Sequence, residues 1–203
     1  MRNSISVTLI LLSLCLLSGC ATRNVPPADI YTISPERAEN SQHPEPGQLI
    51  IKLAPMRTTR AFSGTEILYS DAEHALNSYA YSRWSDAPVR LLQVLFQLAL
   101  EESGRFAAVI PATSASEAHL LLESTLYDFS HHIHADGTSS GVIRARFYLI
   151  DYANKTVIAT KEFISTVPAA SKNAQSATAA LNRAATNVAR DYVAWLTEHD
   201  RIR

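Results

Sequence analysis

Cysteine and glycine are scarce in this sequence. Of its 203 residues, only two are cysteine and six are glycine. The chain has no C-x-x-C pair, no glycine-rich phosphate loop with its lysine, no G-x-S-x-G elbow and no H-E-x-x-H pair. The usual redox, nucleotide-binding, serine hydrolase and zinc peptidase motifs are therefore excluded. We predict that the protein is not an enzyme and has no catalytic residues, no cofactor and no metal.

An excess of charge of one sign is also missing. Lysine and arginine number 18 and aspartate and glutamate 19, which gives a formal net charge of −1. Without a basic field, no electrostatic argument favours binding to nucleic acid. Hydrophobic residues make up 47% of the chain, which excludes disorder over most of its length and is enough for the core of one domain.

The apolar run near the start is too short for a permanent membrane span. Residues 5–17 contain only serine and threonine as polar members and would reach about 20 Å as a helix. The hydrocarbon core of a bilayer is about 30 Å thick. The run follows Arg2 and precedes small residues, which is the layout of a secretory signal peptide over residues 1–19.

The end of this run resembles the lipobox of bacterial lipoproteins. Leu17 is followed by two small residues, Ser18 and Gly19, and then by Cys20. The resemblance implies cleavage before Cys20, a diacylglyceryl group on its thiol and a further acyl chain, such as palmitate, on its amine. Two or more chains anchor a protein stably to a membrane. The alternatives are an uncleaved anchor and an ordinary buried thiol at Cys20.

Removal of the leader would also remove Cys15. The mature chain would then carry a single, acylated cysteine, so we expect no disulfide framework. The stability of the domain must come from its apolar core.

Prolines are concentrated after the cysteine. Five of the nine lie within residues 26–46, in a stretch also rich in polar residues, which predicts an extended spacer. Residues 30–33 favour β structure and could add a short edge strand. We expect an acylated tether over residues 20–47 and a single domain over residues 48–199.

Periodicity in this domain predicts an α+β fold. Strands are expected at residues 49–54, 66–70, 76–81, 118–130, 142–152 and 157–166. One helix is expected over residues 88–102, with Asp86 as its N-cap and Gly104 at its end. A second is expected from Ser171 or Asn173 to near His199. We predict a two-layer sandwich in which these two helices pack on one face of a mixed, mostly antiparallel sheet.

Three histidines are candidate metal ligands. His131, His132 and His134 lie close together, and neutral imidazole binds zinc or copper. No cysteine can join them, and the carboxylates Asp128 and Asp136 are near only in sequence. We therefore favour the alternative, in which these histidines lie at the solvated end of a hairpin, and predict no metal site.

A group of aromatic residues precedes the first helix. Tyr79, Tyr81, Arg83 and Trp84 are of the types that anchor protein interfaces, so they form a candidate partner surface. The alternative is that Trp84 fills the corner where the strand leads into the helix.

The order of several segments resembles the ABC-type transport auxiliary lipoproteins. Besides the lipobox, the segments are residues 62–69, Arg83-Trp84, Ala87-Pro88, Gly104-Arg105-Phe106, residues 148–151, residues 157–159 and Ala194-Trp195-Leu196. The resemblance covers roughly residues 30–196.

This resemblance implies a periplasmic lipoprotein that works with an ABC transporter and an Mce (mammalian-cell-entry) protein in lipid transport between membranes. It also implies ring-like homo-oligomers, and the helix over residues 88–102, which is apolar around most of its circumference, would suit burial at such a contact. Residue 21 is Ala rather than the Asp of the inner-membrane retention signal, which favours the outer membrane.

We therefore expect a non-enzymatic subunit that docks a transport complex at the outer membrane. One alternative is an envelope-assembly lipoprotein, or one that binds a hydrophobic ligand between the sheet and the helices. Another is a lipoprotein that uses the three histidines for metal binding or catalysis.

Overall fold

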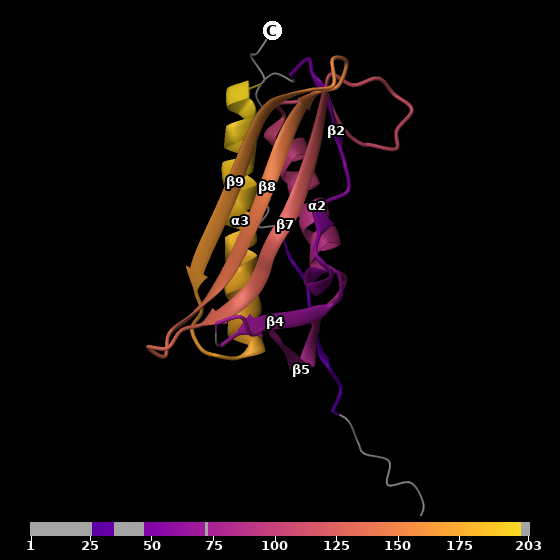
Figure 1. Ribbon diagram of the computed structural model, residues 1–203. Helices are drawn as coiled ribbons and strands as arrows, with labels where there is room; N and C mark the ends of the chain where they lie inside the picture. Colours follow the sequence, from indigo (N-terminus) through magenta and orange to yellow (C-terminus); the bar gives the residue numbers. More distant parts are fainter. Residues whose placement is uncertain (1–25, 35–46, 72, 200–203) are drawn as a thin grey trace, which may run out of the picture.

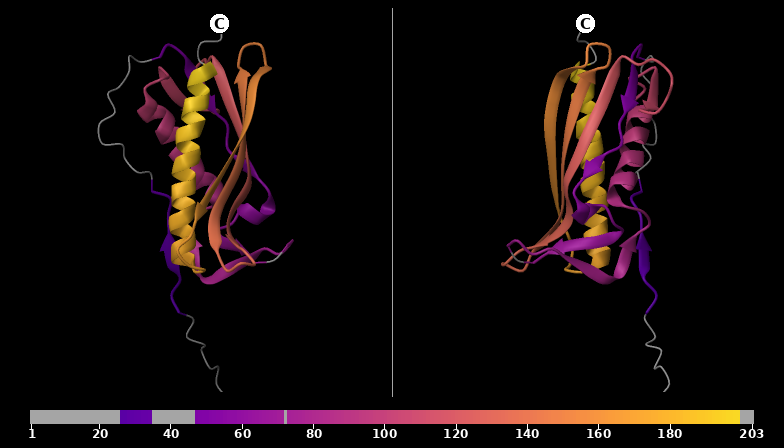
Figure 2. Two further views of the ribbon diagram at one scale, coloured as in Figure 1. Left: turned by 90° about the vertical axis from the view of Figure 1, so that its left-hand side faces the viewer. Right: turned by 45° about the vertical axis from the view of Figure 1, so that its right-hand side comes forward.

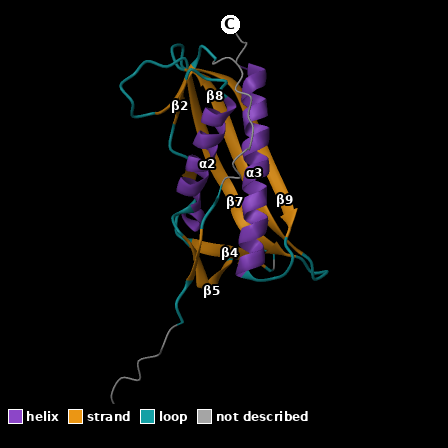
Figure 3. Ribbon diagram, turned by 180° about the vertical axis from the view of Figure 1, so that it is seen from behind, coloured by secondary structure: helices purple, strands orange, loops and turns teal. Residues whose placement is uncertain are grey.

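A computed structural model describes residues 26–34, 47–71 and 73–199 of the chain (Figure 1). The expected signal peptide and Cys20 lie outside the described residues. The described residues contain a sheet of nine strands, and two long helices lie on one face of its long strands (Figures 1 and 3). The α+β class with two main helices is confirmed.

The strands differ greatly in length. In chain order they are β1 (Asp29–Tyr31), β2 (Ile50–Leu53), β3 (Arg57–Thr58), β4 (Glu66–Ser70), β5 (Asn77–Trp84), β6 (Ala108–Pro111), β7 (Leu120–Ile133), β8 (Ser139–Asp151) and β9 (Thr156–Pro168). The helices are the short 3-10 helix η1 (Arg60–Phe62), α2 (Pro88–Ser103) and α3 (Ala174–His199).

The prediction of a mostly antiparallel sheet is wrong. Five strand pairs are parallel: β1–β5, β2–β6, β2–β7, β3–β7 and β4–β7. Three are antiparallel: β4–β5, β7–β8 and β8–β9. The antiparallel pairs join strands that follow each other in the chain, whereas the short strands pair with partners distant in sequence. The result is a curled mixed sheet in which β4 and β5 cross one end of the long strands (Figure 1).

The run predicted as an edge strand does join the sheet. β1 pairs in parallel with β5 and lies at the end of the strand order. The segment after β1 is also fixed to α3, because Ser34 N–H donates to Asn182 Oδ1 at 2.9 Å. Asn182 Nδ2 in turn donates to the carbonyl of Thr32 at 3.1 Å.

Buried and more exposed side chains alternate in β8, whereas a bulge interrupts the alternation in β7. In β8, Ile143 and Phe147 are buried under the helices, whereas Arg144 on the opposite face is exposed. In β7 the register shifts between Leu126 and Asp128, which marks a β-bulge. The bulge reverses which side chains point inward in the rest of the strand.

The helix ends follow from their capping residues. The N-cap of α2 is Ala87 rather than the predicted Asp86, whose Oδ1 instead accepts a 2.7 Å hydrogen bond from Ala87 N–H. Gly104 ends α2 with a φ of 63°, in the left-handed region that glycine adopts without strain. Of the two candidate caps for α3, Asn173 is the one used, since its Oδ1 accepts a 2.8 Å hydrogen bond from Ser176 N–H.

The core lies between the long strands and the helices. Aromatic side chains join them: Phe147 of β8 stacks on Tyr192 of α3 at 4.9 Å between ring centroids and meets Phe96 of α2 at 5.4 Å. Alanines on the sheet-facing side of α3, such as Ala180 and Ala184, let the helix approach closely. This packing sets the position of the surfaces described next.

Candidate docking surfaces

A pocket lined by tyrosines lies between β1, β5 and the start of α3. It has a volume of about 370 Å³, and Tyr31, Tyr79 and Tyr81 line it together with Asp29 and Lys172. Tyr79 and Tyr81 belong to the predicted partner surface. Tyr31 and Lys172 were missed because nothing in the sequence shows that β1 pairs with β5. The only available signal was the β-favouring run at residues 30–33.

The four residues of the predicted partner surface do not all reach solvent together. Tyr81 is 53% exposed, and Arg83 is exposed on the same strand but does not line the pocket. Trp84 is only 2% exposed and packs on Phe129 with 5.2 Å between ring centroids. This position agrees with the alternative in which the indole fills the corner before the first helix.

Tyr79 forms a hydrogen bond with a buried histidine. Its hydroxyl and Nδ1 of His131 lie 2.7 Å apart, and its ring lies 4.9 Å from that of Tyr69. Burial, with a smaller contribution from Tyr69, raises the pKa of Tyr79 to about 12. Tyr79 therefore stays protonated and serves to hold the strand, which leaves Tyr81 as the tyrosine of β5 that faces solvent.

The three histidines do not converge on one point. His131 is fully buried, and burial lowers its pKa. Nε2 of His132 lies 2.8 Å from Asp128 Oδ2, and this contact raises the pKa of His132. Nε2 of His134 lies 3.1 Å from Ser140 Oγ. Across residues 26–34, 47–71 and 73–199, no three His, Cys, Asp or Glu side chains form a cluster that could hold a metal.

The expectation that these histidines lie at the solvated end of a hairpin is wrong for His131. It belongs to β7, pairs with Gly141 of β8 and points into the core. The β-bulge after Leu126 puts it there, since strict alternation from Leu122 and Leu126 would turn His132 inward instead.

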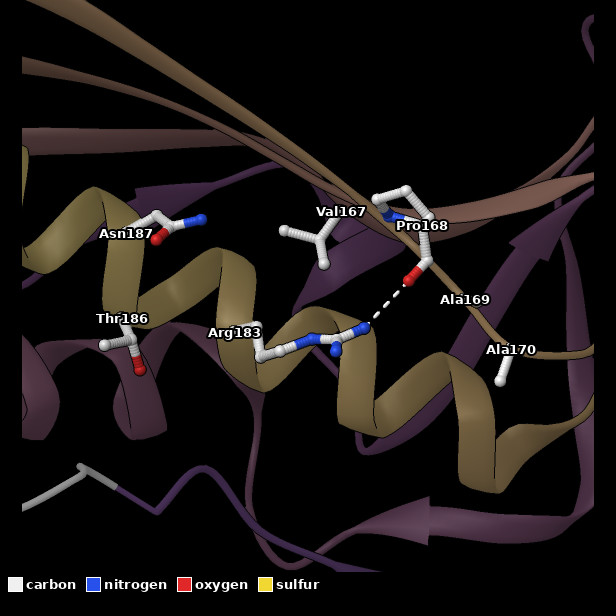
Figure 4. A pocket seen from close by; sticks show the side chains of 7 residues that line it. All are labelled: Val167, Pro168, Ala169, Ala170, Arg183, Thr186 and Asn187. Atoms are coloured by element: carbon white, nitrogen blue, oxygen red, sulfur yellow. Dashed lines mark hydrogen bonds between the residues drawn. The ribbon is translucent and has the colours of Figure 1, made fainter.

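A groove follows the end of β9 beside α3 (Figure 4). It has a volume of about 620 Å³ and is lined by residues 167–170 of the strand end together with Arg183, Thr186 and Asn187 of the helix. Arg183 Nη2 donates a 2.8 Å hydrogen bond to the carbonyl of Pro168. The sequence analysis did not identify this groove, because its two sides come together only through tertiary packing.

A small cavity lies between the sheet and the helices in the described part of the chain. The cavity that Ser124, Phe147 and Tyr192 line there, with Gln93 and Phe96, has a volume of about 10 Å³. That is about the room that one water needs. A lipid chain does not fit in it.

The outward side of α2 carries an apolar stripe that the described residues leave partly exposed. Val94 is 58% exposed, and Leu91 and Leu98, three and four residues away on the same side, are half-buried. This exposed stripe is compatible with the expectation that the helix is buried at a contact with a neighbour, and that contact stays a prediction.

Comparison with known proteins places this fold in a family. Residues 31–193 match the family described as ABC-type transport auxiliary lipoprotein component. The chain belongs to this family. Such auxiliary lipoproteins are components of ABC-type transport, which implies transporter partners. In the described part of this auxiliary lipoprotein, no helix is both long and apolar enough to cross a membrane.

Solved structures share the fold of this auxiliary lipoprotein. The crystal structure of protein XCC0632 from Xanthomonas campestris, of family DUF330, has 21% sequence identity and a TM-score of 0.75, covering 83% of this chain and 94% of that one. A second crystal structure, of an uncharacterized protein, has 11% identity and a TM-score of 0.65, covering 84% and 99%. No curated protein matches the sequence.

Proposed function

We propose that the protein is a non-enzymatic, lipid-anchored subunit that docks an ABC transporter and Mce-type complex at the outer membrane for lipid transport between membranes. The observation that carries this proposal is the family match over residues 31–193, preceded by a lipobox-like sequence that ends at Cys20. The described residues are compatible with a binding role, because the two larger pockets that they form are open to the surface.

The anchor and the body have separate tasks in this proposal. Acyl chains on Cys20 hold the protein at the periplasmic face of the outer membrane, and the spacer lets the body reach a partner near that surface. Confinement raises the effective concentration of the body for such a partner. Modest contacts then suffice for docking.

The Mce-type partner would dock on the surface around Tyr81 and Arg83. Both side chains are exposed on β5, next to the tyrosine-lined pocket. Tyrosine and arginine are common among the residues that dominate binding energy at interfaces. The buried contacts of Tyr79 and Trp84 keep the strand rigid beneath them.

The apolar stripe on α2 would serve a different contact. Leu91, Val94 and Leu98 form a strip that suits burial against a second copy of the chain, as in a homo-oligomeric ring. Val94→Asp should then lower the mass of the detergent-solubilised protein in analytical ultracentrifugation, while leaving the protomer folded.

Purification of the full lipidated protein from its native host in mild detergent tests the docking role. An Mce protein should co-purify with the wild type, and Arg83→Glu together with Tyr81→Asp should reduce its recovery. Arg105→Glu is a matched control, since Arg105 is also exposed but lies beyond the far end of α2.

A clean preparation without an Mce protein in several detergents would contradict the proposal. Equal recovery with the double variant and the wild type would contradict the docking surface alone.

A further inference from the structure

β9 is a long strand with one open edge. It has 13 residues and, among the described residues, pairs only with β8 (Figure 2). Ala169 N–H donates to the carbonyl of Ser139, which shows that the odd-numbered residues near this end bond to β8. Because the bonding direction alternates along a strand, Ile164 and Thr166 direct their N–H and C=O groups to the open side.

The position of Arg183 confirms this direction. Pro168 is also even-numbered, and its carbonyl accepts the hydrogen bond from Arg183 Nη2. The guanidinium therefore stands at the open edge, at the end of the strand. No carboxylate of the described residues lies within ion-pair distance of it, in contrast to Arg144 and Arg146, which share Glu162.

The two halves of β9 differ in whether a charged side chain discourages another strand from pairing with the open edge. Lys161 points to the helix side in the middle of β9, where an inward charge discourages another strand from pairing. The half from Ile164 to Val167 has no such charge. Ile164 is 62% exposed on the outer face, and Val167 lines the 620 Å³ groove on the inner face.

We propose that this half of β9 binds an extended, acidic peptide segment of another protein by strand addition. The segment would pair with the main-chain groups of Ile164 and Thr166. One of its apolar side chains would enter the groove over Val167, and an Asp or Glu side chain would pair with Arg183. Strand addition of this kind takes affinity from main-chain hydrogen bonds and specificity from pockets for alternate side chains.

Charge favours such a segment over a second copy of this strand. If two copies of β9 paired in antiparallel fashion about Ile164, Lys161 of the second copy would lie opposite Val167. That position is beside Arg183, where two cations repel each other. The site is also separate from the β5 surface and the α2 stripe, and it does not depend on the transport role.

Peptide selection tests this proposal. A phage-displayed library of random dodecapeptides is selected for binding to the full lipidated protein in detergent. Binders should share alternating β-branched residues with one Asp or Glu. Thr166→Pro removes an edge N–H and Arg183→Glu reverses the cation, and each should weaken a selected peptide by roughly tenfold or more.

Two matched control variants test whether the loss of peptide binding is specific to Thr166 and Arg183. Thr160→Pro removes an edge N–H in the protected half of β9, and Arg190→Glu reverses an exposed arginine further along α3 that pairs with Asp191. Both should bind as the wild type does. A peptide whose acidic residue is changed to lysine should prefer the Arg183→Glu variant to the wild type.

Hydrogen exchange keeps the test valid if Thr166→Pro fails to fold. A bound peptide should protect the wild-type amides of Ile164 and Thr166 and leave those of odd-numbered neighbours unchanged. The proposal is overturned if no binder is enriched, or if binders ignore Arg183→Glu and protect other residues. It is also overturned if Thr166→Pro dissociates a wild-type oligomer, which would assign the edge to a second copy.

Discussion

His131 and His132 are neighbours in β7 with opposite electrostatic environments. Burial lowers the pKa of His131 from its ordinary value of 6.5, whereas the contact with Asp128 raises that of His132. His131 therefore contributes stability that is present above pH 6.5 and is lost as the pH falls towards its folded pKa. The contribution of His132 is present below pH 6.5 and is lost as the pH rises through its folded pKa.

Substitution of the two histidines should have opposite effects on the pH dependence of the free energy of unfolding. Between about pH 5 and pH 7, His131→Gln should lose less stability on acidification than the wild type, and His132→Gln should lose more. Urea unfolding followed by circular dichroism across this range measures the slope. Parallel slopes for the wild type and both variants would contradict this account.

The hydroxyl of Tyr192 is buried without a protein partner. The residue is fully buried in the core, and its hydroxyl forms no hydrogen bond with any of the described residues. We expect Tyr192→Phe to change the free energy of unfolding by less than about 1 kcal/mol, in the stabilising direction, because it removes an unpaired polar atom. Tyr192→Ala should cost about 3–5 kcal/mol because it leaves a cavity among Phe96 and Phe147. Chemical denaturation measures both, and a loss of several kcal/mol in the phenylalanine variant would refute the first.

Burial at the residue scale was predictable wherever alternation is unbroken. In β8 the sequence pattern alone assigns Phe147 to the core and Arg144 to the opposite face, and both lie there. In β7 the same reasoning failed for His131. A β-bulge depends on the pairing of two strands, and no local residue pattern in β7 marks its position.

At the scale of elements, α3 approaches the sheet closely at Gly141. A Cβ there would lie 2.7 Å from the main-chain nitrogen of Leu181 and 2.9 Å from the carbonyl carbon of Ala180. Gly141→Ala should therefore push the helix from β8 and cost about 1–3 kcal/mol of unfolding free energy. Thr160→Ala, at an exposed position of β9, should change it by less than about 0.5 kcal/mol. Equal stability of the two variants in urea would show that the helix has room to move.

Element ends were predictable where a residue has a strong local preference. Gly104 and Asn173 end and begin helices because of their own conformational and hydrogen-bonding properties, so the sequence indicates both. The short strands β3 and β6 were not identified. A strand of two or four residues has too few side chains to show a period, and it forms because a neighbouring strand offers an edge.

The fold of the whole molecule includes pairs of strands that are distant in the sequence, and local sequence patterns do not predict such pairs. The hairpins β4–β5 and β7–β8–β9 could be predicted from turns between adjacent strands. The parallel pairing of β2 and β4 with β7 joins segments that are distant in the chain, and hydrophobic periodicity carries no information on partner or direction. The groove beside Arg183 and the pocket beside Tyr31 were missed for the same reason.

At the scale of the whole molecule, we expect attachment to the membrane to depend on Cys20. In the native host, we expect the wild type in the outer-membrane fraction of a sucrose gradient, and we expect Cys20→Ser to leave that fraction. Mass spectrometry of the wild type should find acyl chains on this residue. An unmodified thiol, or a leader still attached, would refute the anchoring and with it the proposed location.

The way the N-terminal segment joins the body determines how the protein bears tension. β1 is held by its pairing with β5, and Ser85 N–H donates a 2.7 Å hydrogen bond to the carbonyl of Tyr31. Directly after it, Asn182 holds residues 32–34 to the flank of α3. A pull from a membrane would be divided between a strand and a helix before it reached the aromatic core. We therefore expect these contacts of residues 29–34 to break before the aromatic core opens when the N-terminal segment is pulled.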